Sequence, residues 1–258
     1  MAALEVQDAG EGIPVVLLHG LTATHRYVVM GSRSLERSGH RVIAYDARGH
    51  GRSDPAEPYD YPSLAVDLAR LLDERGLDSA VLAGASMGAH TIARFALDHP
   101  ERVRAAVFIT PAYDPASFPG DLGRWDALAD GLERKGVEGF VEAYGPVTGP
   151  WAETTEKVLH QRLSLHEHPG AVAQALRQVP RSRPFESLDE LGRITAPVVI
   201  VASRDEADPG HPLAVGEAWV RAIPGADLVT EEPGSSPIAW QGGQLSRVIA
   251  QAAAGTVQ

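Results

Sequence analysis

Short apolar runs recur along the chain, each bounded by glycine, proline or charged residues. The runs are rich in Val, Ile and Leu and show no alternation of apolar and polar positions. This pattern is typical of strands that are covered on both faces of a parallel sheet. We therefore predict six strands, within residues 14–20, 41–49, 79–86, 103–111, 197–205 and 226–234.

Several of these runs are separated by segments in which apolar residues recur at the longer spacing of a helix. Residues 61–76 carry apolar side chains at helical spacing, and Gly76 is a good C-terminal stop. A second helix is predicted over residues 86–98, closed by Pro100. Because strands and helices alternate, the sequence predicts an α/β protein with a mostly parallel, doubly wound sheet.

One long segment interrupts this alternation. From Pro111 to Ile194 no strand-like run occurs, and the apolar spacing predicts helices only, within residues 124–136, 137–145, 151–168 and 171–179. Connections in α/β units are usually about 2–6 residues long. We interpret the segment as a helical cap inserted over the carboxyl edge of the sheet. The predicted organisation is a core domain of residues 1–110 and 195–258 with a cap, or lid, of residues 111–194.

Charge and composition exclude several classes of function. The 258-residue chain has a formal net charge of −11, which argues against a nucleic-acid partner or an anionic membrane surface. It has no cysteine, so disulfides, thiolate nucleophiles and iron–sulfur clusters are excluded. The N-terminal residues lack the pattern of a signal peptide, and no apolar run is long enough to cross a bilayer. A cytoplasmic location is the default expectation.

The stretch GASMG, residues 84–88, places a serine between two glycines where a predicted strand turns into a predicted helix. In open α/β sheets, ligands bind beyond the carboxyl ends of the strands. A turn this tight leaves no room for side chains at Gly84 and Gly88, and it exposes the hydroxyl of Ser86 beside the positive end of the helix. The GxSxG pattern alone is a weak signal. Its strand–turn–helix context makes Ser86 a strong candidate nucleophile.

Three motifs together resemble the α/β-hydrolase fold superfamily, over nearly the whole chain. They are the turn at Ser86, the stretch LLHGLTATH at residues 17–25 and the stretch YDARGHGRSD at residues 45–54. The resemblance implies that Ser86 is the nucleophile and that the backbone N–H groups of Leu21 and Met87 form an oxyanion hole. It also implies the chain order nucleophile, helical cap, acid and histidine.

The same resemblance suggests a catalytic acid in VIVASRDEADPGHP, which is similar to the family's loop after the penultimate strand. The family carries an aspartate about four residues before a proline, which matches Asp205 with Pro209. Asp208 is the near alternative. Asp114 is a third candidate, because some relatives hold the acid after the preceding strand.

The catalytic histidine implied by the family should follow the last strand, and here the sequence departs from the pattern. The chain reads VTEEPGSSPIAWQGG, with Pro237 about where the histidine belongs, and no histidine follows His211. His25, on the oxyanion loop, and His211, after the acid loop, are the candidate substitutes. Glu231 and Glu232 are further candidate bases, although carboxylates at that position are expected to be exposed to solvent.

Other histidines are expected to serve structural purposes. His19 and His50 belong to family loops, where hydrogen bonding within the loop is the ordinary use, and His90 is expected to pack or cap in the helix after the serine. The spacing of His166 and His168 does not suit a helical metal pair. We therefore expect no metal. No nucleotide-binding fingerprint occurs either, so no cofactor is expected.

Two classes of function follow. The first is a serine hydrolase that acts on a small carboxylic ester or related acyl compound, with Ser86 as nucleophile and a displaced base. The alternative is a degenerate member without a complete triad, either a ligand-binding protein or an enzyme of another reaction class. Loss of the base costs a serine protease about a million-fold in rate, so the choice depends on whether a substitute base exists. A small molecule is the expected partner in both cases.

Overall fold

The computed structural model describes residues 2–149, 151–204 and 208–255. Its described part contains a sheet of seven strands in the order β1-β3-β2-β4-β5-β6-β7. Only β1 is antiparallel, pairing with β3, and the other neighbours are parallel. The strands are β1 Val6–Ala9, β2 Ile13–Leu18, β3 His40–Tyr45, β4 Ala80–Ala85, β5 Val103–Ile109, β6 Val198–Val201 and β7 Asp227–Val229.

Each of the six apolar runs coincides with one of the strands β2 to β7, as predicted, with β2 and β3 beginning one residue before their runs. The additional strand, β1, was missed because it is an edge strand. Three of its four residues are exposed, and it has only Val6 as a large apolar residue, so it carries no apolar run. It is held to β3 by backbone pairing and by the ion pair of Arg41 with Asp8, neither of which leaves a hydrophobic pattern in the sequence.

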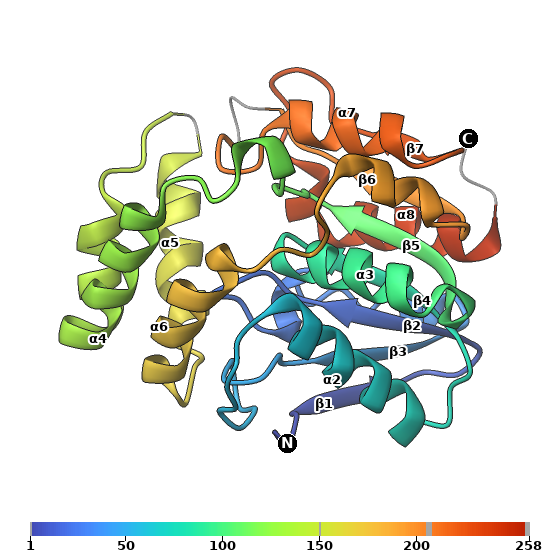
Figure 1. The fold of residues 1–258 in the computed structure, drawn as a ribbon, viewed down its shortest axis with the longest axis horizontal. Coiled ribbons are helices and arrows are strands. Elements are labelled where there is room, and N and C mark those ends of the chain that lie inside the picture. The colour runs from blue at the N-terminus through green and yellow to red at the C-terminus, as the bar shows by residue number, and fades with distance from the viewer. Residues whose placement is uncertain (1, 150, 205–207, 256–258) are drawn as a thin grey trace.

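Helices cover both faces of the sheet, which confirms the doubly wound α/β prediction (Figure 1). Side chains such as Leu82 and Phe108 pack on one face against α2, α3 and α7, whereas Val81 and Val107 pack on the other face against α1 and α8. Adjacent strand residues thus enter opposite cores, as the pleat requires. The five helices are α1 Ser34–Arg37, α2 Tyr61–Glu74, α3 Met87–Asp98, α7 Leu213–Ala222 and α8 Gly242–Ala254.

The predicted helix ends of α2 and α3 have clear local causes. The Asp60 carboxylate accepts the Ser63 N–H at the start of α2, a side-chain N-cap. After the last turn of α2, Gly76 adopts φ of +66°, the left-handed conformation of a helix stop. The following helix, α3, ends at Asp98 shortly before Pro100.

The long insertion is helical, as predicted, and in its described residues no strand occurs. It contains α4 Leu122–Tyr144, α5 Ala152–Leu163 and α6 Pro169–Gln178, which lie together beyond one edge of the sheet (Figure 1). They share a small apolar core that includes Leu132, Phe140 and Leu176. The α4 segment is kinked at Gly136, so it consists of the two helical pieces that the periodicity predicts.

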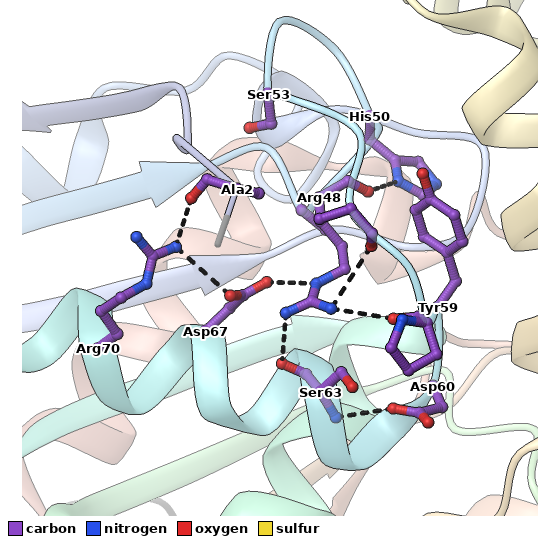
Figure 2. A network of polar contacts seen from close by, with 12 residues as sticks. Ala2, Arg48, His50, Ser53, Tyr59, Asp60, Ser63, Asp67 and Arg70 are labelled. Atoms are coloured by element: carbon purple, nitrogen blue, oxygen red, sulfur yellow. Dashed lines mark hydrogen bonds and ion pairs between the residues drawn. The ribbon is translucent and has the colours of Figure 1, made fainter.

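A buried ion pair anchors the loop after β3 (Figure 2). Arg48 Nε donates to Asp67 Oδ2 on α2 at 2.7 Å, and Arg48 Nη2 donates to the Ser63 carbonyl at 3.1 Å. Arg70 in turn donates to the Ala2 carbonyl and to Asp67. This network fixes the loop of the YDARGHGRSD motif against α2 and the N-terminal residues.

Candidate active site

Ser86 lies in a strained turn between β4 and α3. It precedes the first residue of α3 and has φ of 49° and ψ of −111°, a conformation that costs a non-glycine residue about 1–3 kcal/mol. Its N–H donates to the Ile109 carbonyl at 2.9 Å, and its carbonyl accepts the His90 N–H at 3.0 Å. Two backbone bonds therefore hold the strained residue, and its side chain is partly exposed.

The two glycines of the motif are required by close approach of the backbone. A Cβ added at Gly84 would lie 2.5 Å from the carbonyl carbon of Gly88. A Cβ added at Gly88 would lie 2.3 Å from the Leu18 carbonyl oxygen on the neighbouring strand. Real Cβ atoms do not approach backbone so closely, so the absence of side chains allows β2, β4 and α3 to pack around the turn.

Backbone strain is concentrated at the carboxyl ends of the central strands. Among the described residues, four non-glycine residues adopt positive φ: Thr22, Met30, Ser86 and Thr110. Three of these, all except Met30, lie in loops that follow β2, β4 and β5 at the same edge of the sheet. Strained residues persist where the surrounding structure imposes their conformation, and they cluster at active sites. This edge of the sheet is therefore the candidate site.

Two backbone donors are available next to Ser86. A Cβ at Gly20 would be 3.4 Å from the Ser86 Cβ, so the loop that continues with Leu21 passes close to the serine. Within the described part of the chain, neither the Leu21 N–H nor the Met87 N–H donates to a protein acceptor. The Met87 N–H belongs to the first turn of α3, where donors have no partner inside the helix. Free donors of this kind stabilise a developing oxyanion.

His25 is held by a buried carboxylate. Its ring Nδ1 and its backbone N–H both donate to Asp46 Oδ1, each at 2.8 Å. The Arg52 N–H donates to the other carboxylate oxygen at 3.2 Å. Burial alone would raise the pKa of Asp46. The hydrogen bonds from His25 and the electrostatic effect of the neighbouring His19 outweigh burial and hold this pKa at about 2. The pair connects the loop after β2 to the end of β3.

A second carboxylate–histidine pair lies in the loop after β6. His211 Nδ1 is 3.0 and 2.9 Å from the two carboxylate oxygens of Asp208, and both side chains are partly buried. Asp205, the acid implied by the family pattern, falls outside the described residues. The pairing of Asp208 with His211 is a finding that the sequence did not indicate.

The remaining candidate carboxylates differ from one another. Asp114 accepts the Ala116 N–H and so caps its own short turn. Glu232 is exposed, as expected. For Glu231 the expectation of solvent exposure is wrong: it is 5% exposed, because its Oε1 accepts the Arg204 N–H at 2.7 Å and draws the side chain inward. Its other oxygen is buried without a partner among the described residues.

His19 and His90 are structural, in line with expectation. His90 Nε2 accepts the Ala112 and Tyr113 N–H groups, so the ring is neutral, and its pKa is lowered to about 3, mainly by burial and also by the nearby His211. His19 Nε2 accepts the Ala47 N–H, and burial lowers its pKa to about 4. Neither ring is free to act on Ser86.

The Ser86 hydroxyl makes no hydrogen bond to a described side chain. Also among the described residues, no group of three or more histidine, aspartate or glutamate side chains is arranged to hold a metal ion. No described helix has the length and apolar character needed to cross a bilayer. The insertion histidine His166 uses both ring nitrogens structurally, accepting from the Gly51 N–H and donating to the Thr22 carbonyl.

This arrangement matches known proteins. A family profile described as "alpha/beta hydrolase fold" matches residues 13–238. The chain belongs to the α/β-hydrolase fold family. The resemblance on which the motifs were interpreted is thereby confirmed for the fold, while the roles of individual residues are a separate question.

Family relatives can be compared along most of the chain. It is 30% identical over 208 residues to a putative carbamate hydrolase of Variovorax paradoxus, covering 79% of this chain and 77% of that protein. It is 32% identical over 238 residues to a 2-hydroxy-6-oxononadienedioate/2-hydroxy-6-oxononatrienedioate hydrolase of Pseudomonas putida, covering 87% and 82%. Among solved structures, a thermophilic esterase from Thermogutta terrifontis superposes with a TM-score of 0.78 at 23% identity, covering 99% of this chain and 94% of that one.

Proposed function

We propose that the protein is a serine hydrolase of small carboxylic esters or related acyl compounds, with Ser86 as nucleophile. The strained conformation of Ser86 between β4 and α3 is the observation that carries this proposal, because such strain persists only where the surrounding structure imposes it. The free N–H groups of Leu21 and Met87 would bind the oxyanion. The helical segment 111–194 would act as the cap over this site.

The base is proposed to be His211, oriented by Asp208. The carboxylate binds Nδ1, which leaves Nε2 without a partner among the described residues, as a general base requires. His211 is close enough to His90, one turn after Ser86 on α3, to contribute to lowering the pKa of that ring. This pair would supply, from the loop after β6, the histidine that the sequence lacks near Pro237.

The alternative base is His25 with Asp46. Here the same carboxylate oxygen takes both the ring and the backbone N–H of His25, and Arg52 donates to the second oxygen. Such a closed set of bonds suits a role in holding the oxyanion loop. We therefore assign His25 a positioning role and His211 the proton transfer.

The reaction then takes two steps. In the first, Ser86 Oγ attacks the ester carbonyl carbon as His211 Nε2 takes the hydroxyl proton, and the alcohol leaves with that proton to give an acyl-enzyme. In the second, water attacks the acyl carbon and gives a proton to His211, which passes it to Ser86 Oγ as the carbon–Oγ bond breaks and the acid is released. Both tetrahedral intermediates place their negative oxygen at the N–H groups of Leu21 and Met87.

Relatives support a hydrolase with a small-molecule substrate. The names of the Variovorax and Pseudomonas proteins describe a carbamate hydrolase, marked putative, and a hydrolase of a nine-carbon dienedioate or trienedioate. Both proteins are matched along at least three quarters of their length. Their substrates differ, so they support the reaction class rather than one compound.

Burst kinetics test the proposal. The protein is mixed with 4-nitrophenyl acetate and with a serine-directed fluorophosphonate. We expect about one equivalent of nitrophenol in the burst and labelling at Ser86, both lost in Ser86→Ala. Ser164→Ala is the matched control, because that exposed hydroxyl only donates to the His160 carbonyl. An unlabelled protein without a burst would refute the nucleophile assignment.

A second candidate function is ligand binding by a degenerate member. The observation in its favour is the Ser86 hydroxyl, which makes no hydrogen bond to any described residue. The same experiment separates the two functions, because a binding protein would give neither a burst nor labelling while still being stabilised thermally by its ligand.

A further inference from the structure

Arg162 differs from the other arginines that contribute a buried nitrogen. Its Nε is buried without a hydrogen-bond partner, and in the described part of the chain its guanidinium makes no hydrogen bond or ion pair. Arg70 and Arg75 also have a buried Nε without a hydrogen bond. However, Arg70 donates to Glu74 through another nitrogen, and Arg75 forms an ion pair with Asp8. The side chain of Arg162 is only partly buried, so its remaining nitrogens are accessible. A cation without a protein acceptor, with one nitrogen already buried, is a suitable partner for an anionic ligand.

The position of Arg162 is next to the candidate active site. It lies in the last turn of α5, four residues before His166, whose ring donates to the Thr22 carbonyl in the oxyanion loop. At the other end of the helix, Trp151 packs edge-on against Trp240, with ring centroids 6.2 Å apart. Thus α5 extends from the loop after β7 to the loop after β2, across the edge where Ser86 lies.

The guanidinium interacts electrostatically with α4 and with both loops of the proposed site. Burial lowers the pKa of Arg162, while Tyr144 at the end of α4, and then Asp208 and Tyr27, act in the opposite direction. Burial also lowers the pKa of His166, and Arg162 adds to that lowering. The arginine is thus near Tyr27, on the loop after β2, and near Asp208, on the loop after β6.

We propose that Arg162 binds a carboxylate of the substrate, so that the preferred substrate is an ester with a second, anionic carboxylate group at some distance from the bond that is broken. This inference rests on the proposed function. A guanidinium offers a planar pair of donors that match a carboxylate, and the nearby Asp208 is already engaged by His211. In a chain of net charge −11, an anionic substrate needs such a local cation to overcome the repulsion of the rest of the protein.

A pair of matched esters tests the assignment. Monomethyl adipate and methyl hexanoate have the same acyl chain length and differ by the terminal carboxylate. We expect the unmodified protein to prefer the adipate, and Arg162→Gln to lower kcat/KM for the adipate by about a hundred-fold, mainly through KM, with less than about a three-fold effect on the hexanoate. Arg162→Lys should retain part of the preference. Arg134→Gln, which removes an exposed charge on α4, is the control and should leave the ratio unchanged.

Binding measurements separate this inference from the proposed function. In the Ser86→Ala background, calorimetry should show that Arg162→Gln weakens adipate binding by a similar factor and leaves hexanoate binding unaffected. Selective binding without turnover of either ester by the unmodified protein would uphold the anion site and overturn the hydrolase. Turnover of both esters with an equal loss in Arg162→Gln would uphold the hydrolase and overturn the anion site. A fall in thermal stability accompanied by equal losses would likewise assign Arg162 to cap attachment.

Discussion

Two carboxylate–histidine pairs flank the candidate active site, and they are built differently. Asp46 is nearly inaccessible to solvent and accepts from the His25 ring, the His25 backbone and the Arg52 backbone. The Asp208 carboxylate is partly exposed, and among the described residues only the His211 ring hydrogen-bonds to it. A carboxylate with several fixed donors is suited to holding a loop in place, whereas one whose only partner is a histidine ring is suited to orienting a base. The same two residue types therefore support two different roles.

The largest expected effect is on catalysis. His211→Ala should lower kcat/KM for an activated ester by about a thousand-fold or more, since a general base and its orienting carboxylate act as a unit. Steady-state kinetics with 4-nitrophenyl acetate measure it, with His99→Ala, an exposed histidine at the far end of α3, as the control. Full activity in His211→Ala would reverse the assignment of the two pairs and point to His25.

A change in the turn that holds Ser86, the proposed nucleophile, sharpens the comparison because both carboxylate–histidine pairs stay intact. Gly88→Ala places a Cβ against the Leu18 carbonyl, and we expect the free energy of unfolding to fall by about 3 kcal/mol. Urea denaturation measures it. Gly170→Ala is the matched control, because no atom lies within 4 Å of the added Cβ. An unchanged unfolding midpoint for Gly88→Ala would show that the turn is less tightly packed than described.

Acid should weaken the buried part of the site before it affects the Asp46 pair. The pKa of His19 falls from 6.5 unfolded to about 4 folded, and that of His90 to about 3, because burial disfavours the charged ring. Between pH 6.5 and 4 the unfolded state therefore binds more protons, so stability is fully present above pH 6.5 and is lost as the pH falls.

The expected loss is about 3 kcal/mol for His19 by pH 4. Asp46, with its pKa held at about 2, keeps its contribution over this range and loses it only below its ordinary value of 3.8. Thermal unfolding from pH 7 to 4 measures how stability depends on pH. His90→Gln should make this dependence weaker. A transition temperature independent of pH over this range would contradict burial of neutral rings.

The smallest effect is expected for the structural pair. His25→Ala removes one donor to Asp46 but leaves the backbone N–H bond, so stability should fall by about 1–2 kcal/mol and kcat/KM by less than ten-fold. Chemical denaturation and steady-state kinetics on the same preparation measure both, with His168→Ala as the control. A loss of activity larger than that of His211→Ala would identify His25 as the base.

Local patterns in the sequence were enough to predict the framework and the turn that holds Ser86. Apolar runs predict the strands β2 to β7 because burial on both faces requires them, and the spacing of Gly84 and Gly88 predicts the turn at Ser86. The pairing of His211 with Asp208 has no such signal, because it depends on the path of a loop. The burial of Glu231 could not be predicted either. It depends on a hydrogen bond from the Arg204 N–H, which joins segments 27 residues apart. Arg162 looks like an ordinary polar residue of a helix end until the packing of α5 is known.

The kinked helix α4 limits the ways in which the helical insertion can be displaced. A Cβ added at Gly131 would lie 2.2 Å from the Gly139 carbonyl oxygen, and one added at Gly139 would lie 2.1 Å from that of Gly131. The two halves of α4 are therefore in backbone contact, and neither can slide past the other without separating. Any displacement of the insertion must therefore carry the two halves of α4 together as a rigid body, with the movement taken up in the connecting segments on either side.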